Sequence, residues 1–282
     1  MVPTCVWLRF VVHLPCKSRL IPLSPYELVG RMSKLKELVR SAQFFTRPPA
    51  VVSSETKIDM RGYFICATQR SGSNFLCDMI AETGQLGIPR EYFNGTARRV
   101  IDNDPSYPLD AISQVRRILT TGATPNGIYA AKVFPTHYRQ AATAVDIGRS
   151  LPGLHFVFLR RRDLLGQAIS LVIAKQTGKW RAFMKPARPP VYDPKAISSA
   201  IDDLVQDTAA WLAFFARHNI EQIEIVYEDM RANPPGALNA IARHLGLGPV
   251  QPGPSAIDKP VRPAEAHEWR QRYVADMGSP LV

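Results

Sequence analysis

The chain has 282 residues and a mass of 31.4 kDa, and 46% of its residues are hydrophobic against 21% charged. This balance is typical of a globular protein and excludes a disordered or fibrous one. No stretch of the sequence approaches the roughly 20 uninterrupted apolar residues that a membrane-spanning helix needs.

The net charge of +11 favours a substrate or partner that carries negative charge. Residues 1–62 hold ten basic and four acidic side chains, a net of +6, which leaves 25 against 20, a net of +5, for the other 220 residues. The body of the chain is therefore only mildly basic and shows no basic patch interleaved with aromatic residues, so no nucleic-acid partner is predicted.

The four cysteines are Cys5, Cys16, Cys66 and Cys77, too few and too scattered for a disulfide scaffold. No C-x-x-C pair and no Cys/His spacing of a zinc site is present, so no metal is predicted. Cys66 and Cys77 lie in apolar runs and are expected to be buried as free thiols. These features predict a reducing, cytoplasmic location.

The first 23 residues are a poor secretory signal, because Arg9 and His13 interrupt the apolar run and no cleavage site follows. A short strand, a disordered extension and an overlong gene model remain open, with Met32 or Met60 as alternative starts.

An amphipathic helix is predicted next, because Ser24 and Glu27 form a capping box and apolar residues recur every three or four positions after it. Its basic flanks fit contact with a membrane surface through residues 25–45, whereas packing on the body or on a second subunit is the favoured alternative. A Pro/Ser/Thr-rich linker (46–56) follows. We therefore divide the chain into an N-terminal extension (1–62), a main domain (63–276) and a short tail (277–282).

The main domain alternates strands and helices. Strands are predicted over 63–68, 127–134, 154–159 and 223–227, and helices over 74–83, 164–175, 195–218 and 235–245. The apolar strands indicate an α/β fold with a parallel sheet covered by helices on both faces, in three layers. The inward-facing residues of the 195–218 helix are predicted to be Ile201, Leu204, Val205, Trp211, Leu212 and Phe215.

The segment 69–73 between the first strand and its helix has the character of an anion-binding loop. Gly72 permits close approach of the backbone, the helix start offers unpaired N–H groups, and Ser71 and Ser73 add hydroxyl donors. Arg70 adds a planar cation suited to phosphate or sulfate oxygens. No Lys follows Gly72, and Asn74 stands where a hydroxyl would hold Mg²⁺. A metal-free anion with two adjacent acidic groups therefore fits the loop better than ATP with Mg²⁺.

A second basic cluster follows the 154–159 strand. Arg160, Arg161 and Arg162 could bind another phosphate, with Ser170 one or two helical turns further on. The alternative is a solvated loop in which Asp163 caps the next helix.

Five segments together resemble the bacterial trehalose 2-sulfotransferase family over about three quarters of the chain. They are YFICATQRSGSNFLCDMIAETGQLGIPREYFN (63–94), TPNGIYAAKVF (124–134), FLRRRDLLGQAISL (158–171), IEIVYEDMRANP (223–234) and EWRQRY (268–273). The resemblance implies a P-loop-like sulfotransferase fold, a homodimer, and 3′-phosphoadenosine 5′-phosphosulfate (PAPS) as the sulfuryl donor.

By the same resemblance, the donor site consists of Gln69, Arg70, Ser71, Gly72, Ser73 and Asn74 at the 5′-phosphosulfate and of Arg161 and Ser170 at the 3′-phosphate. Glu91 of the motif P-x-E-[YF]-F is implied as the general base; apart from the family, it would be read as a surface carboxylate. Lys132 either touches the bridging oxygen of the donor or is exposed.

The acceptor implied is a hydroxyl of a carbohydrate or glycolipid, used in the cytoplasm or at the membrane periphery. Ile88 departs from the family, whose trehalose-using members carry an acidic residue three positions before the base. The alternative function is a nucleotide-binding protein or phosphotransferase that uses the same loop without Mg²⁺.

Overall fold

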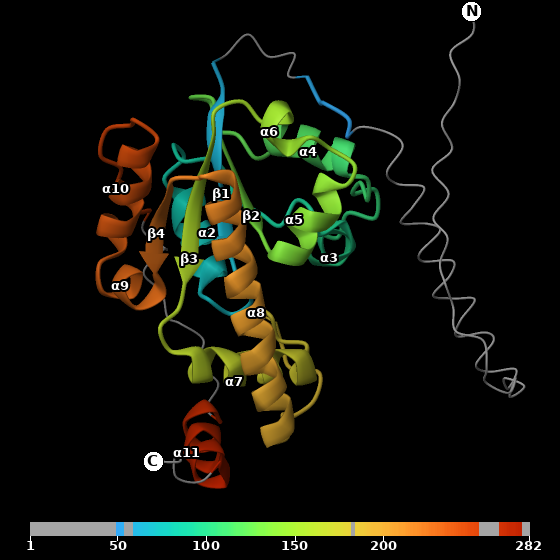
Figure 1. The fold of residues 1–282 in the computed structure, drawn as a ribbon, viewed down its shortest axis with the longest axis vertical. Helices are drawn as coiled ribbons and strands as arrows, with labels where there is room; N and C mark the ends of the chain where they lie inside the picture. The colour runs from blue at the N-terminus through green and yellow to red at the C-terminus, as the bar shows by residue number, and fades with distance from the viewer. Residues whose placement is uncertain (1–48, 54–58, 182–183, 254–264, 278–282) are drawn as a thin grey trace, which may run out of the picture. The chain divides into compact units, whose positions relative to one another are not determined.

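A computed structural model describes residues 49–53, 59–181, 184–253 and 265–277 (Figure 1). The amphipathic helix predicted over 25–45 and the rest of the leader up to residue 48 lie outside the described residues. So do Cys5 and Cys16 and residues 278–282 of the tail.

Four parallel strands form the sheet, in the spatial order β2-β1-β3-β4. The strands are β1 (Arg61–Ala67), β2 (Ile128–Val133), β3 (Leu154–Arg160) and β4 (Gln222–Val226). Each lies within two residues of its predicted bounds, and the prediction of an all-parallel sheet is confirmed.

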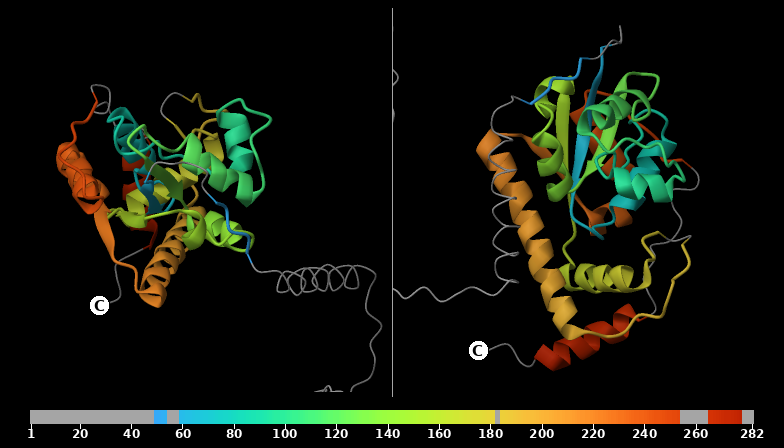
Figure 2. Two further views of the ribbon diagram at one scale, coloured as in Figure 1. Left: turned by 90° about the horizontal axis from the view of Figure 1, so that it is seen from above. Right: turned by 90° about the vertical axis from the view of Figure 1, so that its right-hand side faces the viewer.

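Helices cover both faces of the sheet (Figures 1 and 2). Along β1 the side chains of Tyr63 and Ile65 pack on one face with α2 (Ser73–Glu82) and α10 (Pro234–His244). Phe64 and Cys66 alternate to the other face, which is covered by α4 (Ala111–Thr120), α5 (Pro135–Ala142), α6 (Ile147–Ser150) and α8 (Pro194–His218). The period-two alternation of a buried strand thus supplies both halves of the core.

A third apolar cluster lies beyond the carboxyl ends of the strands, where α7 (Leu164–Thr177) packs against α8 and α11 (Ala266–Met277) (Figure 1). Two short helices, α3 (Gly95–Ile101) and α9 (Tyr227–Ala232), complete the described elements. The long α8 therefore runs along the sheet and continues past the edge where the strands end.

The predicted inner face of α8 is correct at Leu204, Trp211 and Phe215, which are buried, and wrong at Val205 and Leu212, which are each 49% exposed. Ile201 is half-buried. Val205 and Leu212 each follow a buried residue by one position, and one position turns the side chain by about 100° around a helix. They form a second apolar stripe next to the buried one.

The fold uses residues that precede the predicted start at 63. Strand β1 begins at Arg61, and Val52 is buried, with its N–H donating to Ser150 Oγ at 2.9 Å. Cys66 and Cys77 are buried and free, as predicted. Among the described residues, no helix combines the length and the hydropathy needed to cross a membrane.

Candidate active site

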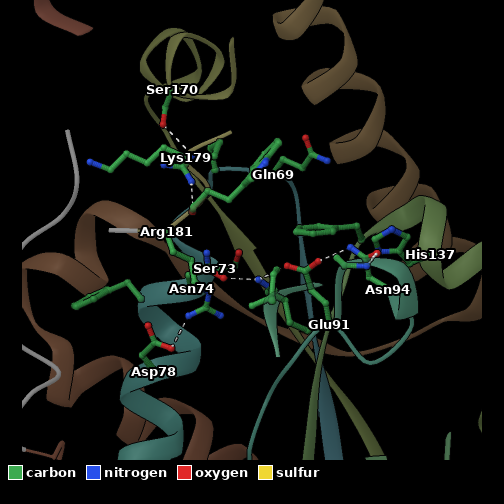
Figure 3. Close-up of a pocket in the computed structure, with 18 of the residues that line it drawn as sticks. Gln69, Ser73, Asn74, Asp78, Glu91, Asn94, His137, Ser170, Lys179 and Arg181 are labelled. Atoms are coloured by element: carbon green, nitrogen blue, oxygen red, sulfur yellow. Dashed lines mark hydrogen bonds and ion pairs between the residues drawn. The ribbon is translucent and has the colours of Figure 1, made fainter. Parts of the chain in front are cut away.

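A cavity of about 520 Å³ lies where the four parallel strands end (Figure 3). This volume is within the usual range for a small-molecule site, and the carboxyl edge is where parallel sheets bind ligands. Eight of the nine predicted site residues line it, namely Gln69, Arg70, Gly72, Ser73, Asn74, Glu91, Arg161 and Ser170. The sheet topology thus brings together residues up to 101 positions apart, from Gln69 to Ser170.

The loop after β1 takes a conformation that depends on glycine. Gly72 has a φ of 89° and directly precedes α2, and a Cβ placed there would lie 2.2 Å from the Tyr227 ring. Arg70, which is not a glycine, also adopts a left-handed conformation, with a φ of 60°. No side chain caps the start of α2, so this end of the helix presents its backbone N–H groups to the cavity.

The ninth predicted residue, Ser71, does not line the cavity. It is fully buried, and its hydroxyl donates to the carbonyl oxygen of Thr68 at 2.8 Å. Its hydroxyl therefore stabilises the turn of the loop and does not face the cavity.

Arg70 crosses the cavity to α7 and to the segment that follows α7. Its Nε donates to Ser170 Oγ at 3.0 Å, and its Nη1 donates to the Trp180 carbonyl at 2.9 Å. Burial and the neighbouring charge of Arg161 lower the pKa of Arg70. Two guanidinium groups are thus held close together with little water, an arrangement that an anionic ligand would relieve.

The three arginines after β3 divide between the cavity and the surface. Arg160 pairs with Glu224 at 2.8 Å, and Arg162 makes two hydrogen bonds to Asp229. Both arginine side chains are exposed, so these are ion pairs at the protein surface. Arg161 alone lines the cavity, and its buried Nε has no hydrogen-bond partner within the described part of the chain.

Asp163 caps α7 by accepting from the Gly166 N–H at 2.9 Å, which confirms its predicted capping. The solvated-loop alternative thus holds for Arg160 and Arg162 and fails for Arg161, which stacks over the Tyr227 ring at 5.0 Å.

Glu91 reaches the cavity because its segment runs back along β2. The N–H of Lys132 donates to the Arg90 carbonyl at 2.9 Å, and Gly87 lies so close to Ala130 that a Cβ there would be 2.8 Å away. The Glu91 side chain is only 16% exposed, and the reading of it as a surface carboxylate is wrong.

Lys132 is buried, which corrects the alternative that it is exposed. Its Nζ lies 2.7 Å from Glu91 Oε1 and donates to Asn74 Oδ1 at 2.6 Å. Burial works to raise the pKa of Glu91, but the Lys132 charge and hydrogen bonds from Lys132 and Asn94 outweigh it and lower the pKa to about 2.

Among the lining residues that were not predicted from the sequence are three basic side chains and a histidine: Arg98, Lys179, Arg181 and His137. Arg98 is buried on α3 and pairs with Asp102 at 3.2 Å, and Arg181 pairs with Asp78 at 3.4 Å. The run Lys179-Trp180-Arg181 after α7 could have indicated Lys179 and Arg181. Basic and aromatic residues there follow a helix that begins at the edge where the strands end.

The donor set of the cavity fits a ligand with several anionic groups. Arginine and lysine side chains and a helix start suit phosphate and sulfate oxygens. No group of three or more potential metal-ligating side chains occurs among the described residues.

Comparisons with known proteins point to one family. A model of the family described as Stf0 sulphotransferase matches residues 62–276. Two curated proteins named trehalose 2-sulfotransferase are similar to the chain. The one from Mycobacterium tuberculosis strain Erdman is 28% identical over 77% of this chain and 96% of its own length; the one from Mycolicibacterium smegmatis is 26% identical over 76% and 94%.

Solved structures give weaker likenesses. A sulfotransferase domain from the curacin biosynthetic pathway has a TM-score of 0.41 at 15% identity and covers 68% of this chain and 76% of its own. A sulfotransferase domain from the Synechococcus PCC 7002 olefin synthase has a TM-score of 0.40 at 15% identity, with coverage of 78% and 91%.

Proposed function

The chain belongs to the Stf0 sulphotransferase family, and we propose that it transfers a sulfuryl group from PAPS to a hydroxyl of a carbohydrate or glycolipid. The observation that carries this proposal is the composition of one cavity. Anion-binding groups on the β1 loop and α7 share it with a half-buried carboxylate, Glu91, that lies 21 residues past Arg70.

The donor would be held between the two loops that follow β1 and β3. The N-terminal end of α2, together with Arg70, suits the 5′-phosphosulfate, and Gly72 lets the loop pack directly against the Tyr227 ring. Arg161 and Ser170 suit the 3′-phosphate; the Nε of Arg161 lies 3.9 Å from Glu228 Oε1 but donates no hydrogen bond to any described residue, so it can still donate one to a ligand. When bound, PAPS supplies an activated sulfuryl group, while the chain supplies binding, orientation and charge.

Glu91 would act as the general base. Its carboxylate takes the proton of the acceptor hydroxyl while the hydroxyl oxygen bonds to sulfur and the bond from sulfur to the phosphate oxygen breaks. The electron pair of that bond leaves on the phosphate oxygen, so the products are a sulfate ester and 3′-phosphoadenosine 5′-phosphate (PAP). Fixed positive groups near the donor oxygens favour this step, as they do in phosphoryl transfer.

The names of the curated relatives make trehalose the first acceptor to test. The acidic residue of trehalose-using members is replaced here by Ile88, which is half-buried with its carbonyl accepting from the Tyr92 hydroxyl at 3.0 Å. We therefore propose a carbohydrate or glycolipid acceptor of which trehalose is one candidate.

Thermal unfolding with PAP, and separately with ATP and Mg²⁺, tests the donor. Ligand at 100 times its dissociation constant stabilises a protein by about 2.7 kcal/mol. We expect stabilisation by PAP, little by ATP with Mg²⁺, and a much smaller PAP effect in Arg70→Ala. A preference for ATP with Mg²⁺ would favour a phosphotransferase instead.

Transfer of ³⁵S from labelled PAPS tests the reaction. We expect labelled product with trehalose or another carbohydrate, and a loss of about 10²–10⁴-fold in rate in Glu91→Gln, the usual contribution of a general base. Full turnover in Glu91→Gln would remove Glu91 from that role. The matched control is Glu224→Gln, a surface carboxylate on β4.

A further inference from the structure

The ammonium group of Lys132 lies between the donor loop and the base. Its Nζ contacts Asn74 Oδ1 at 2.6 Å on one side and Glu91 Oε1 at 2.7 Å on the other, and the side chain is only 3% exposed. Asn74 is the second residue of α2, next to the loop proposed to hold the donor. One buried cation therefore touches both halves of the site.

The other charged and titratable groups that act on Glu91 come from three helices. Arg98 of α3 also lowers the pKa of Glu91, after Lys132 and Asn94, and the Cys77 thiol of α2 and the His137 ring of α5 each interact electrostatically with Glu91. Lys132 is thus the dominant partner of this carboxylate.

This ion pair makes Glu91 a weak base in the protein alone. A general base works best when its pKa lies near the working pH, and a carboxylate held at a pKa of about 2 has little affinity for a proton. The lysine has to loosen its contact before Glu91 can take a proton from an acceptor.

The geometry around Glu91 permits that change. The backbone at Lys132 is fixed by its N–H bond to Arg90, but the ammonium sits at the end of a flexible four-carbon stem. Asn94 holds the other carboxylate oxygen, donating from Nδ2 to Oε2 at 2.9 Å, and its N–H donates to the Glu91 carbonyl at 2.9 Å. Glu91 therefore stays in place if the lysine moves away.

We propose that Lys132 is a positioning residue that withholds Glu91 from base catalysis until the donor occupies the β1 loop, when its ammonium shifts from the Glu91 carboxylate toward the donor oxygens. This inference rests on the proposed function. Base catalysis by Glu91 then depends on bound donor, so that the acceptor hydroxyl is deprotonated only when a sulfuryl group is in place for its oxygen to attack.

The titration of Glu91 tests this directly and needs no turnover. The side-chain carboxyls of glutamate are labelled with ¹³C, and the Glu91 signal is identified by its absence in Glu91→Gln. Titrations are recorded for the protein alone and with PAPS without acceptor, in the wild type, Lys132→Met and Lys132→Arg. Lys195→Met, at an exposed lysine of α8, is the matched control.

In the wild type, PAPS is expected to raise the Glu91 midpoint by about 1–3 units, the size of effect that a close opposite charge exerts. Lys132→Met should raise it by a similar amount without any ligand, and PAPS should then add little. Lys132→Arg keeps the charge and should keep the midpoint low, and Lys195→Met should behave as the wild type.

Three outcomes would overturn the proposal. A low midpoint in ligand-free Lys132→Met would show that the lysine does not hold Glu91. An unchanged wild-type midpoint when PAPS stabilises the protein against heat would leave the sulfotransferase function standing but remove the coupling. An equal rise on adding PAPS in the wild type and in Lys132→Met would assign the shift to the charge of the donor itself. Absence of any PAPS binding would instead overturn the proposed function together with the coupling.

Discussion

Arg70 and Ser170, which are 100 residues apart, are joined by a hydrogen bond of 3.0 Å from the guanidinium Nε to the hydroxyl oxygen. The bond ties the loop after β1 to the helix after β3 across the carboxyl edge of the sheet. Because the serine accepts from Arg70, its own proton is free to point toward a ligand. The two residues therefore form one pre-arranged unit of the proposed donor site.

Truncating Arg70 should weaken PAP binding more than truncating Ser170. Both side chains would bond to a charged phosphate, and a hydrogen bond to a charged group contributes about 1.5–3 kcal/mol. Arg70 also brings a charge of its own, so we expect about 100-fold weaker binding in Arg70→Ala and about 10-fold in Ser170→Ala, measured by calorimetric titration with PAP. Arg160→Ala, whose side chain pairs with Glu224 outside the cavity, should bind as the wild type does. An equal loss in Arg160→Ala and Arg70→Ala would mean that only total charge matters.

Gly72 and Gly84 form a matched pair for testing the loop. Both have positive φ, 89° and 63°, but a Cβ meets nothing within 4 Å at Gly84, whereas at Gly72 it overlaps the Tyr227 ring. Gly84→Ala should cost only the backbone strain, about 1–3 kcal/mol, and leave PAP binding intact. Gly72→Ala should in addition displace Tyr227 and the Arg161 stacked on it and abolish binding. Equal PAP affinity in the two variants would contradict this role for the loop.

The strands and the donor loop were predictable because their signals are local. The apolar run at 63–68 and the Gly/Ser-rich residues after it lie within a dozen positions, and a parallel sheet then places the end of each strand at one edge. The same rule brings Arg161 to the cavity from β3.

The pairing of Lys132 with Glu91 was not predictable, because it depends on how residues 85–94 lie along β2. No pattern in the sequence specifies the bond from the Lys132 N–H to Arg90 that sets this register. The prediction of the inner face of α8 was partly wrong for a related reason. Leu212 is as apolar as its neighbour Trp211, and only packing decides which of two adjacent apolar stripes is buried.

That distinction gives a stability prediction for α8. Trp211 is 1% exposed and donates from Nε1 to the Ala67 carbonyl at 3.0 Å, at the last residue of β1. Trp211→Ala should destabilise the protein by about 3–5 kcal/mol and Leu212→Ala by no more than about 0.5 kcal/mol. For a chain of this size, each kcal/mol lowers the melting temperature by about 2–4 °C, so thermal unfolding separates the two variants. Similar melting temperatures would show that the stripe at Val205 and Leu212 is also covered.

The Glu91–Lys132 pair should also make the free energy of unfolding depend on pH in the acid range. The pKa of Glu91 is lowered from the ordinary 4.5 to about 2, so the folded state binds this proton less readily than the unfolded state does. The stabilisation is therefore fully present above about pH 4.5 and is lost as the pH falls toward 2, and it is on the order of 3 kcal/mol because one pKa unit corresponds to about 1.4 kcal/mol.

Urea unfolding of the wild type and Glu91→Gln between pH 7 and the acid limit of the fold measures this contribution. At neutral pH the glutamine leaves the buried Lys132 without its charge partner, so the variant should be less stable; in acid the protonated wild type resembles it and the difference should shrink. Other carboxylates with lowered pKa, such as Asp163 and Glu228, are common to both proteins and cancel. Glu224→Gln breaks an exposed pair with Arg160 and should change stability by less than about 1 kcal/mol at any pH. A gap between wild type and Glu91→Gln that stays constant as the pH falls would show that Glu91 is not the carboxylate whose titration the lysine controls.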